Sequence, residues 1–184
     1  MEPTTLVIVS GVSCSGKSTF ATRLGARLRW PVLSKDTIKE TLFDTLGTGD
    51  TDWSRRLSDA AYALLFAQAH CSLACERSII VEANFRSGEH EGPLRCLIDE
   101  LSVHAIQVLC RADPEVLIAR FGARRRHSGH LDAALLGRTA SQMRSAVQQP
   151  LAIRAPVIEC DTTDDWRSAI DVAVAMTCER LAAD

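Results

Sequence analysis

Residues 11–18 read Gly-Val-Ser-Cys-Ser-Gly-Lys-Ser, two glycines at the spacing of a phosphate-binding loop, followed by lysine and a hydroxyl residue. The glycines let the backbone take positive φ angles and approach a ligand without a Cβ in the way. Successive backbone N–H groups can then surround phosphate oxygens, and a helix that begins here directs its positive end at the same anion. The segment therefore predicts a binding site for a nucleoside triphosphate.

The residue types of this loop suit different parts of such a ligand. Lys17 is expected to neutralise the β- and γ-phosphates, and the hydroxyl of Ser18 is expected to coordinate Mg²⁺. Cys14 is either a reactive thiol, with its pKa lowered by a helix N-terminus, or a small side chain that the loop tolerates. The residues expected to bind the nucleotide here are Gly11, Val12, Ser13, Cys14, Ser15, Gly16, Lys17, Ser18 and Thr19.

A second cluster, residues 34–39, follows the second predicted strand and reads Ser-Lys-Asp-Thr-Ile-Lys. The carboxyl ends of parallel strands share one edge of a sheet, so this cluster should lie beside the loop. Asp36 can accept a proton from an acceptor hydroxyl, while Lys35 and Lys39 can hold the acceptor or neutralise charge. Aspartate is also a preferred N-cap, so Asp36 is a candidate both for the base and for the cap of the next helix.

A third cluster ends the apolar strand before Glu82 and continues to Arg86. An acid at this edge can hold Mg²⁺ through its water shell or orient an acceptor. Glutamate is one methylene longer than the usual aspartate, so both roles stay open for Glu82. Arg86 either faces the acceptor or is a solvated surface residue. Asn84 completes this group of candidate acceptor ligands.

A fourth cluster runs from Arg120 to His130 and contains three consecutive arginines, residues 124–126. Guanidinium groups beside a glycine are typical of a lid that closes on a triphosphate and spreads the charge that develops during transfer. We expect a lid at about residues 121–131, with Arg124 and Lys17 as charge stabilisers. The alternative is a solvated basic helix end. His127 and His130 have no third ligand at a helpful spacing, so zinc is not expected.

The elements that must position these clusters alternate between β-rich runs and amphipathic patterns, which predicts a parallel sheet with crossover helices. The predicted strands are Thr5–Ser10, Pro31–Ser34, Ser78–Glu82, Val103–Cys110 and Val157–Cys160. The predicted helices are Lys17–Leu28, Asp36–Leu46, Asp52–Glu76, His90–Leu101, Pro114–Arg125, Leu131–Val147 and Asp164–Ala182. The expected fold class is α/β, a three-layer α/β/α sandwich with a five-stranded parallel sheet.

The composition fits one domain over residues 1–184, without a linker or an internal repeat. A formal charge of −2 gives no general attraction for nucleic acid. Seven cysteines without a Cys-x-x-Cys pair indicate buried, reduced thiols rather than a disulfide framework. No apolar stretch approaches the ~18 residues that span a bilayer, so a soluble cytoplasmic protein is expected. The oligomeric state cannot be predicted from the sequence.

With these residues in view, the chain resembles the P-loop kinases of the zeta-toxin-like and small-molecule kinase group, the AAA_33 type, which is related to the 5′-kinase domain of polynucleotide kinases. The likeness spans residues 11–19, 34–39, 82–86 and 120–130 in the family's order. It implies a general base at Asp36 and phosphate contacts at Arg120 and Arg124. It also implies the P-loop nucleoside triphosphate hydrolase fold with sheet order 2-3-1-4-5, as in adenylate kinase, and an adenine border at residues 161–163 that includes Thr162.

The resemblance and the residues together favour a kinase that uses ATP and Mg²⁺ to phosphorylate a hydroxyl of a metabolite, a nucleoside-like compound or an antibiotic. A polynucleotide 5′-hydroxyl kinase is one alternative, but the acidic balance and few aromatics favour a small molecule. A nucleotide-dependent switch without transfer is another. The acceptor pocket is expected between helices 36–46 and 52–76, where Trp53, Arg56, Tyr62 and Phe66 are either lining or core.

Overall fold

The computed structural model describes residues 3–183, with the backbone alone at residues 133–135. Residues 1, 2 and 184, which the predicted domain includes, lie outside the described residues. Five parallel strands form one sheet in the order β2-β3-β1-β4-β5, which confirms the expected fold and strand order. The strands are β1 (Thr5–Ser10), β2 (Val32–Ser34), β3 (Ile79–Glu82), β4 (His104–Arg111) and β5 (Val157–Asp161).

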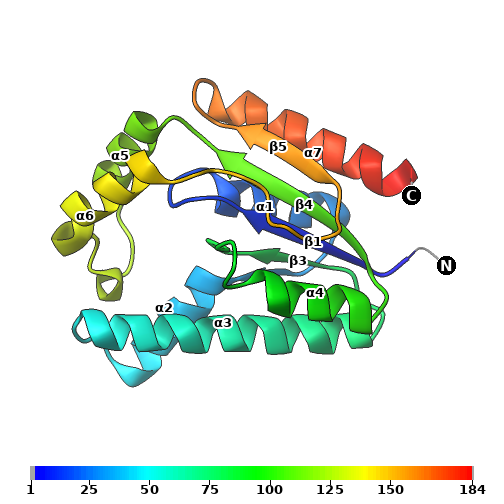
Figure 1. The fold of residues 1–184 in the computed structure, drawn as a ribbon, viewed down its shortest axis with the longest axis horizontal. Helices are drawn as coiled ribbons and strands as arrows, with labels where there is room; N and C mark the ends of the chain where they lie inside the picture. The colour runs from blue at the N-terminus through cyan, green and yellow to red at the C-terminus, as the bar shows by residue number, and fades with distance from the viewer. Residues whose placement is uncertain (1–2, 184) are drawn as a thin grey trace.

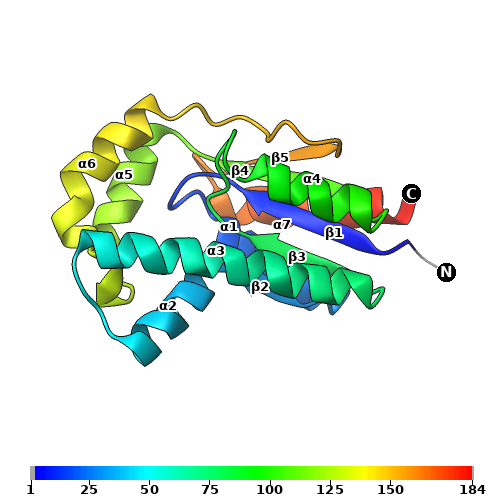
Figure 2. The same cartoon turned by 60° about the horizontal axis from the view of Figure 1, so that its bottom comes forward.

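Helices cover both faces of this sheet (Figures 1 and 2). The helices are α1 (Lys17–Leu28), α2 (Lys35–Leu46), α3 (Thr51–Ala74), α4 (Glu91–Glu100), α5 (Pro114–Ala123), α6 (Asp132–Ser145) and α7 (Trp166–Ala183), with a 3₁₀ turn η1 (Ser128–His130). In Figure 2, α3 and α4 lie in front of the sheet and α1 and α7 behind it. Helices α5 and α6 lie beyond the strand ends, at the left of Figure 1.

Two hydrophobic clusters hold the layers together because β1 is buried on both faces. Successive side chains of a strand point to opposite faces, so the apolar run of β1 contributes to both clusters. Leu6 and Ile8 pack into the cluster that contains Leu65 of α3 and Leu94 of α4. On the other face, residues 7 and 9 pack with α1 and α7. This packing fixes the height of β1, and with it the position of the loop that follows.

Helix boundaries differ from the prediction mainly where the chain enters or leaves the predicted lid, residues 121–131. The helix expected to end at Arg125 ends at Ala123, and the helix expected from Leu131 starts at Asp132. The cysteine prediction is partly wrong, because Cys71, Cys75 and Cys96 are exposed. Among the described residues, no helix is long and apolar enough to cross a membrane.

Candidate active site

The loop after β1 has a backbone that only glycine accepts at two positions. Gly11 has φ +136, and a Cβ there would lie 2.0 Å from the carbonyl oxygen of Cys110. Gly16 has φ +90 and is followed at once by the first residue of α1. The loop is thus held against β4 on one side and opens directly into a helix N-terminus, the arrangement that binds phosphate.

Lys17 is buried beneath this loop, with 6% of its surface exposed. Its Nζ donates a hydrogen bond of 2.9 Å to the carbonyl oxygen of Val12 and lies 3.9 Å from Oε1 of Glu82. The ammonium group is therefore held inside the loop, where its charge adds to that of the helix N-terminus.

Cys14, also in the loop, has φ 68 and accepts a hydrogen bond of 3.3 Å from Nη1 of Arg124. Burial raises the pKa of its thiol, although Arg124 and Lys17 act in the opposite direction. Because only the thiolate is a strong nucleophile, this shift argues against a reactive Cys14. The interpretation as a tolerated small side chain fits the structure.

Asp36 lies in the first turn of α2, two residues after the N-cap Ser34, so the expectation that it caps this helix is wrong. Its carboxylate instead accepts hydrogen bonds from Arg126 Nη1 at 2.8 Å and Lys35 Nζ at 3.3 Å. Burial alone would raise the pKa of Asp36, but Lys35 and Arg126 outweigh it and hold the pKa at about 2. The carboxylate is therefore ionised throughout the neutral range.

Glu82 joins β2, β3 and the loop. It is 4% exposed, and its Oε2 accepts a hydrogen bond of 2.7 Å from Ser34 Oγ, while its Oε1 faces Lys17. Parallel pairing of Ser34 with Glu82 in the sheet produces this contact. Glu82 consequently lies on the nucleotide side of the site. The roles of Glu82 as a ligand of Mg²⁺ and as a contact of the acceptor both stay predictions.

Arg124 reaches from the end of α5 to the loop. Its guanidinium group stacks over Phe121 at 4.1 Å and donates from Nε to Asp132 at 3.0 Å. Its Nη2 is buried and has no hydrogen-bond partner among the described residues. Buried polar groups are normally paired, so this nitrogen is available to an anionic ligand.

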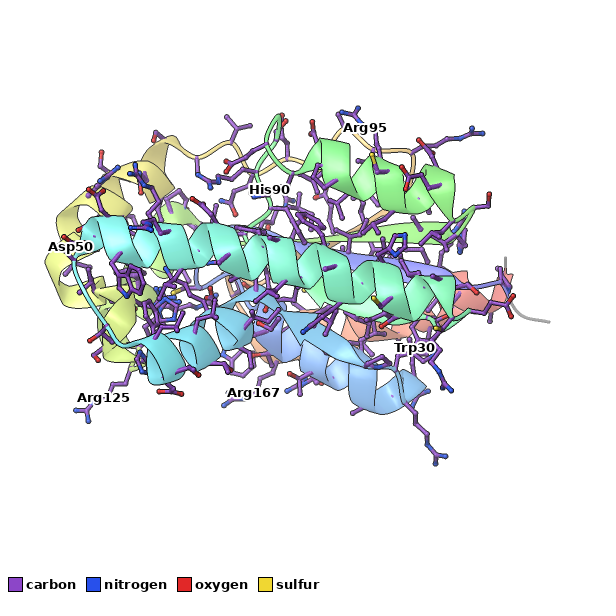
Figure 3. All side chains as sticks on the ribbon, turned by 90° about the horizontal axis from the view of Figure 1, so that it is seen from below. Trp30, Asp50, His90, Arg95, Arg125 and Arg167 are labelled. Carbon is purple, nitrogen blue, oxygen red and sulfur yellow. The ribbon has the colours of Figure 1, made fainter. Side chains whose placement is uncertain are left out.

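Arg126 is the residue that the sequence interpretation missed. It donates to Asp36 and, at 2.7 and 2.9 Å, to the two carboxylate oxygens of Asp132. Nothing in the run of three arginines distinguishes Arg126 from Arg125, which Figure 3 shows pointing into solvent. Only the folded lid shows which of the neighbouring arginines faces Asp36.

Arg120 contacts Thr162, which the resemblance places at the border of the adenine. Arg120 donates to Oγ1 and to the carbonyl oxygen of Thr162, at 3.0 and 2.6 Å. Thr162 is fully buried, and its hydroxyl lies 3.2 Å from the carbonyl oxygen of Ser15. The side chain of Thr162 thus supports the loop from behind and does not border an adenine, because no part of it is exposed.

The lid continues over α2 through residues 127–130. His127 Nε2 lies 3.1 Å from Asp44, and His130 Nε2 lies 2.9 Å from Glu40. Burial and the nearby Arg126 lower the pKa of His130 to about 4, so it is neutral near pH 7. Gly129 packs so closely on Phe43 that a Cβ would lie 2.6 Å from the ring. Both histidines thus join the lid to α2.

Two cavities meet at Asp36 and Arg126, which line both of them. The first, of about 410 Å³, is lined on the loop side by Ser18, Glu82 and Arg124. The second, of about 790 Å³, is lined by the predicted acceptor ligands Lys35, Lys39, Asn84 and Arg86, together with Arg56. It adjoins a third cavity of about 490 Å³ at Ser13 and Asn84.

Three of the predicted lining residues are absent from these cavities. Tyr62 and Phe66 pack into an aromatic group with Phe85 and His90, and Tyr62 donates to the carbonyl oxygen of Asn84 at 2.8 Å. Trp53 donates from Nε1 to the carbonyl oxygen of Gly47. Tyr62 and Phe66 thus belong to the core, whereas Trp53 is half-buried at the start of α3.

The first cavity carries the donors that suit Mg²⁺, namely the hydroxyl of Ser18 and the carboxylates of Asp36, Glu40 and Glu82. Hard oxygen ligands are those that Mg²⁺ prefers, and the ion usually keeps several waters and binds phosphate oxygens as well. Within the described part of the chain, no three His, Cys, Asp or Glu side chains form a ready metal cluster. The residues fit an ion held mainly through a nucleotide.

Comparison with known proteins adds evidence about the fold. A family model described as an AAA domain, AAA_33, matches residues 6–150. A candidate kinase from Chloroflexus aurantiacus is 31% identical over 100% of this chain and 98% of that chain, with a TM-score of 0.88.

Two more distant structures share the fold. A sugar kinase from Janibacter sp. is 19% identical over 96% of this chain and 95% of that chain, with a TM-score of 0.63. The APS kinase of Mycobacterium tuberculosis, solved with AMPPNP and APS, is 18% identical over 96% of this chain and 99% of that chain, with a TM-score of 0.60. No curated protein matches the chain.

Proposed function

We propose, from the premise that this chain belongs to the AAA_33 family of P-loop proteins, that it is an ATP-dependent kinase for a hydroxyl group of a small molecule. The observation that carries the proposal is the shared wall of the two cavities. Asp36 and Arg126 separate a cavity at the phosphate-binding loop from a larger cavity lined with polar and basic side chains. A switch that transfers nothing does not require such a second cavity.

The loop is proposed to bind the triphosphate through its backbone N–H groups. Lys17 exchanges its contact with the carbonyl oxygen of Val12 for the β- and γ-phosphates. Arg124 offers its buried, unpaired Nη2 to the same phosphates. Ser18 and Glu82 are placed to hold Mg²⁺, which when bound would neutralise charge on the β- and γ-oxygens.

The γ-phosphoryl group is proposed to pass to the acceptor beside Asp36. A hydroxyl of the acceptor donates a hydrogen bond to this carboxylate, and its oxygen attacks the γ-phosphorus of ATP in line with the bond to the leaving oxygen. The new P–O bond forms while the bond to ADP breaks, and the hydroxyl proton passes to Asp36. With a pKa of about 2, Asp36 is ready to accept the hydrogen bond at any neutral pH, and takes the proton late in the reaction.

Arg126 is proposed to orient the base. One nitrogen binds Asp36, and two others are held by the two oxygens of Asp132, so the guanidinium group is fixed on both sides. Such bidentate contacts are geometrically specific as well as strong. The carboxylate of Asp36 then points at the boundary between the cavities without depending on the acceptor to order it.

The proposal is tested with Asp36→Asn, which keeps the shape but removes the charge. We expect kcat to fall by about two orders of magnitude or more, the usual effect of a positioned base, with the Kd for ATP within about threefold. The assay follows ADP release over a panel of sugars, sugar acids, nucleosides and aminoglycosides. The control is Asp99→Asn, an exposed acid of α4 far from the loop in sequence. Equal turnover of Asp36→Asn and the unmodified chain would refute the assignment.

A further inference from the structure

The chain has only three lysines, Lys17, Lys35 and Lys39, and all three are buried at the candidate site. Every other basic residue except histidine is an arginine. Lysine is rarely buried, because its ammonium group is strongly hydrated. Lys17 belongs to the phosphate-binding loop, so the proposed nucleotide accounts for its position. The other two lysines line the second cavity and require a separate explanation.

Lys35 and Lys39 lie four residues apart on α2, so they share one face of the helix. Helix α3 packs beside α2, as Figure 3 shows, and contributes Ser54 and Ser58 at the same spacing to the cavity wall. The Nζ of Lys39 donates a hydrogen bond of 2.9 Å to Ser54 Oγ. Two ammonium groups and two hydroxyl groups from adjacent helices therefore line one part of the cavity.

Positive charge is in excess in this cavity, whose wall carries six lysine and arginine side chains and four carboxylates, those of Asp36, Asp59, Glu89 and Asp132. Lys35 is paired with Asp36, Arg86 with Glu89, and Arg126 with Asp36 and Asp132. Among the described residues, Lys39 and Arg56 have no carboxylate partner within 4.0 Å. They lie over aromatic rings instead, Lys39 at 5.2 Å from Phe43 and Arg56 at 5.6 Å from Trp53.

An unpaired ammonium group is expensive when its side chain is buried. Lys39 is 6% exposed, and its hydrogen-bond acceptor is a neutral hydroxyl. A neutral acceptor molecule would leave this charge without a counter-ion and would displace water from it. An anionic group would supply the missing charge and accept hydrogen bonds from Lys39 and from the serine hydroxyls.

We propose that the acceptor alcohol carries an anionic group, a phosphate, sulfate or carboxylate, which Lys35 and Lys39 bind in the second cavity. The transfer to this alcohol rests on the proposed kinase function, whereas the binding of the anion does not. Asp36 and Lys39 are three residues apart on α2, so their Cβ atoms are about 5–6 Å apart. The hydroxyl and the anionic group therefore belong to a molecule about the size of a sugar acid or a sugar phosphate.

The first experiment measures the binding of anions in the absence of turnover. Because the chain has three lysines, ¹³C-labelled lysine yields three sets of side-chain NMR signals, each assigned by substitution. The phosphate-binding loop is saturated with Mg²⁺ and a non-hydrolysable ATP analogue, and inorganic phosphate, sulfate or acetate is then added. We expect the signals of Lys35 and Lys39 to shift, with an affinity about tenfold or more weaker in Lys39→Met.

The control for this measurement is Arg27→Met, which removes an exposed positive charge at the end of α1 and should leave the affinity unchanged. Anion-induced shifts confined to Lys17, or an affinity that Lys39→Met does not change, would overturn the proposal. The relative affinities for phosphate, sulfate and acetate show which anion the subsite prefers.

The second experiment compares turnover within sets of acceptors that differ mainly in the anionic group. One set is glucose, gluconate and glucose 6-phosphate, and another is adenosine and AMP. We expect an anionic member of a set to have a kcat/KM about tenfold or more above its neutral counterpart, and Lys39→Met to remove this preference. If neutral acceptors are used equally well before and after the substitution, the anion proposal fails while the kinase proposal stands. If anions bind at Lys39 but no acceptor is phosphorylated, the kinase proposal fails and the anion subsite stands.

Discussion

The burial of Lys39 predicts that its replacement by methionine stabilises the ligand-free protein at neutral pH. Burial lowers the pKa of Lys39 from 10.5 to about 8, and the positive charge of Lys35 acts in the same direction. Asp36 and Asp132 oppose this change, and Arg126 adds to it. Lys35 also has a lowered pKa, mainly because of its burial.

The size of the expected stabilisation follows from the pKa values of Lys39 in the unfolded and the folded chain. The difference between 10.5 and about 8, at about 1.4 kcal/mol per pKa unit, corresponds to about 3 kcal/mol. Water in the adjoining cavity screens part of this interaction, so we expect a cost of about 2 kcal/mol near pH 7. The Lys39→Met substitution would remove this cost but would also lose the hydrogen bond to Ser54.

The pH dependence of the free energy of unfolding isolates the electrostatic contribution of Lys39. A lysine with a folded-state pKa below its unfolded value destabilises the protein fully below the folded pKa, and this cost disappears as pH rises toward the unfolded value. The stability advantage of Lys39→Met should therefore be largest below about pH 8 and smaller by about 1–2 kcal/mol near pH 9.5.

Urea unfolding of both proteins at pH 7 and pH 9.5 measures this difference, in buffers without phosphate or sulfate so that no anion occupies the subsite. Arg27→Met is the control, because an exposed arginine stays protonated throughout this range. A stability advantage of Lys39→Met that stays constant or grows as pH rises would refute the description of Lys39 as a buried, unpaired ammonium group.

Three further predictions concern the lid and the loop. Gly129→Ala places a Cβ 2.6 Å from the ring of Phe43, so the lid should separate from α2, with kcat lowered by about tenfold and stability by about 1–3 kcal/mol, both measurable on the purified variant. Arg126→Met removes a positive charge that lowers the pKa of Asp36, so that pKa should rise from about 2 toward 3.8. On acidification, the variant should therefore lose activity at a higher pH than the unmodified chain. Identical dependence of kcat on pH in the acidic range would contradict this. Burial raises the pKa of Cys14, so iodoacetamide at pH 7 should alkylate it more slowly than the exposed cysteines, as mass spectrometry of the digested protein would show, and faster labelling of Cys14 would contradict the structure.

Much of the architecture could be predicted because it depends on local patterns. The continuous apolar run of β1 marks a strand buried on both faces, and the loop residues that follow specify their own backbone through Gly11 and Gly16. Lys35 and Lys39 could be selected because their chemistry and their place after a strand are both visible in the sequence. Membership in AAA_33 confirms that part of the resemblance, while the relation to polynucleotide kinases and the roles of the site residues stay predictions.

The errors lie where the outcome depends on contacts between distant segments. Asp36 has the residue type of an N-cap, yet its carboxylate turns to Arg126, which is 90 positions away. Thr162 follows a strand as a ligand-binding residue would, yet it is buried beneath the loop by contacts with Arg120 and Ser15. Local preferences cannot predict these pairings, because each depends on how the lid and β5 close around the sheet.

The sequence patterns therefore determined the strands, the phosphate-binding loop and the cluster around Asp36, since backbone conformation and hydrophobic periodicity are local properties, whereas the strand order was implied by the resemblance to a known family. Only the tertiary structure decided which arginine faces Asp36, that Glu82 lies on the nucleotide side, and that Lys39 is buried without a carboxylate partner among the described residues. Pairing, burial and the resulting pKa values are set by side chains from several elements, and those distances exist only in the folded chain.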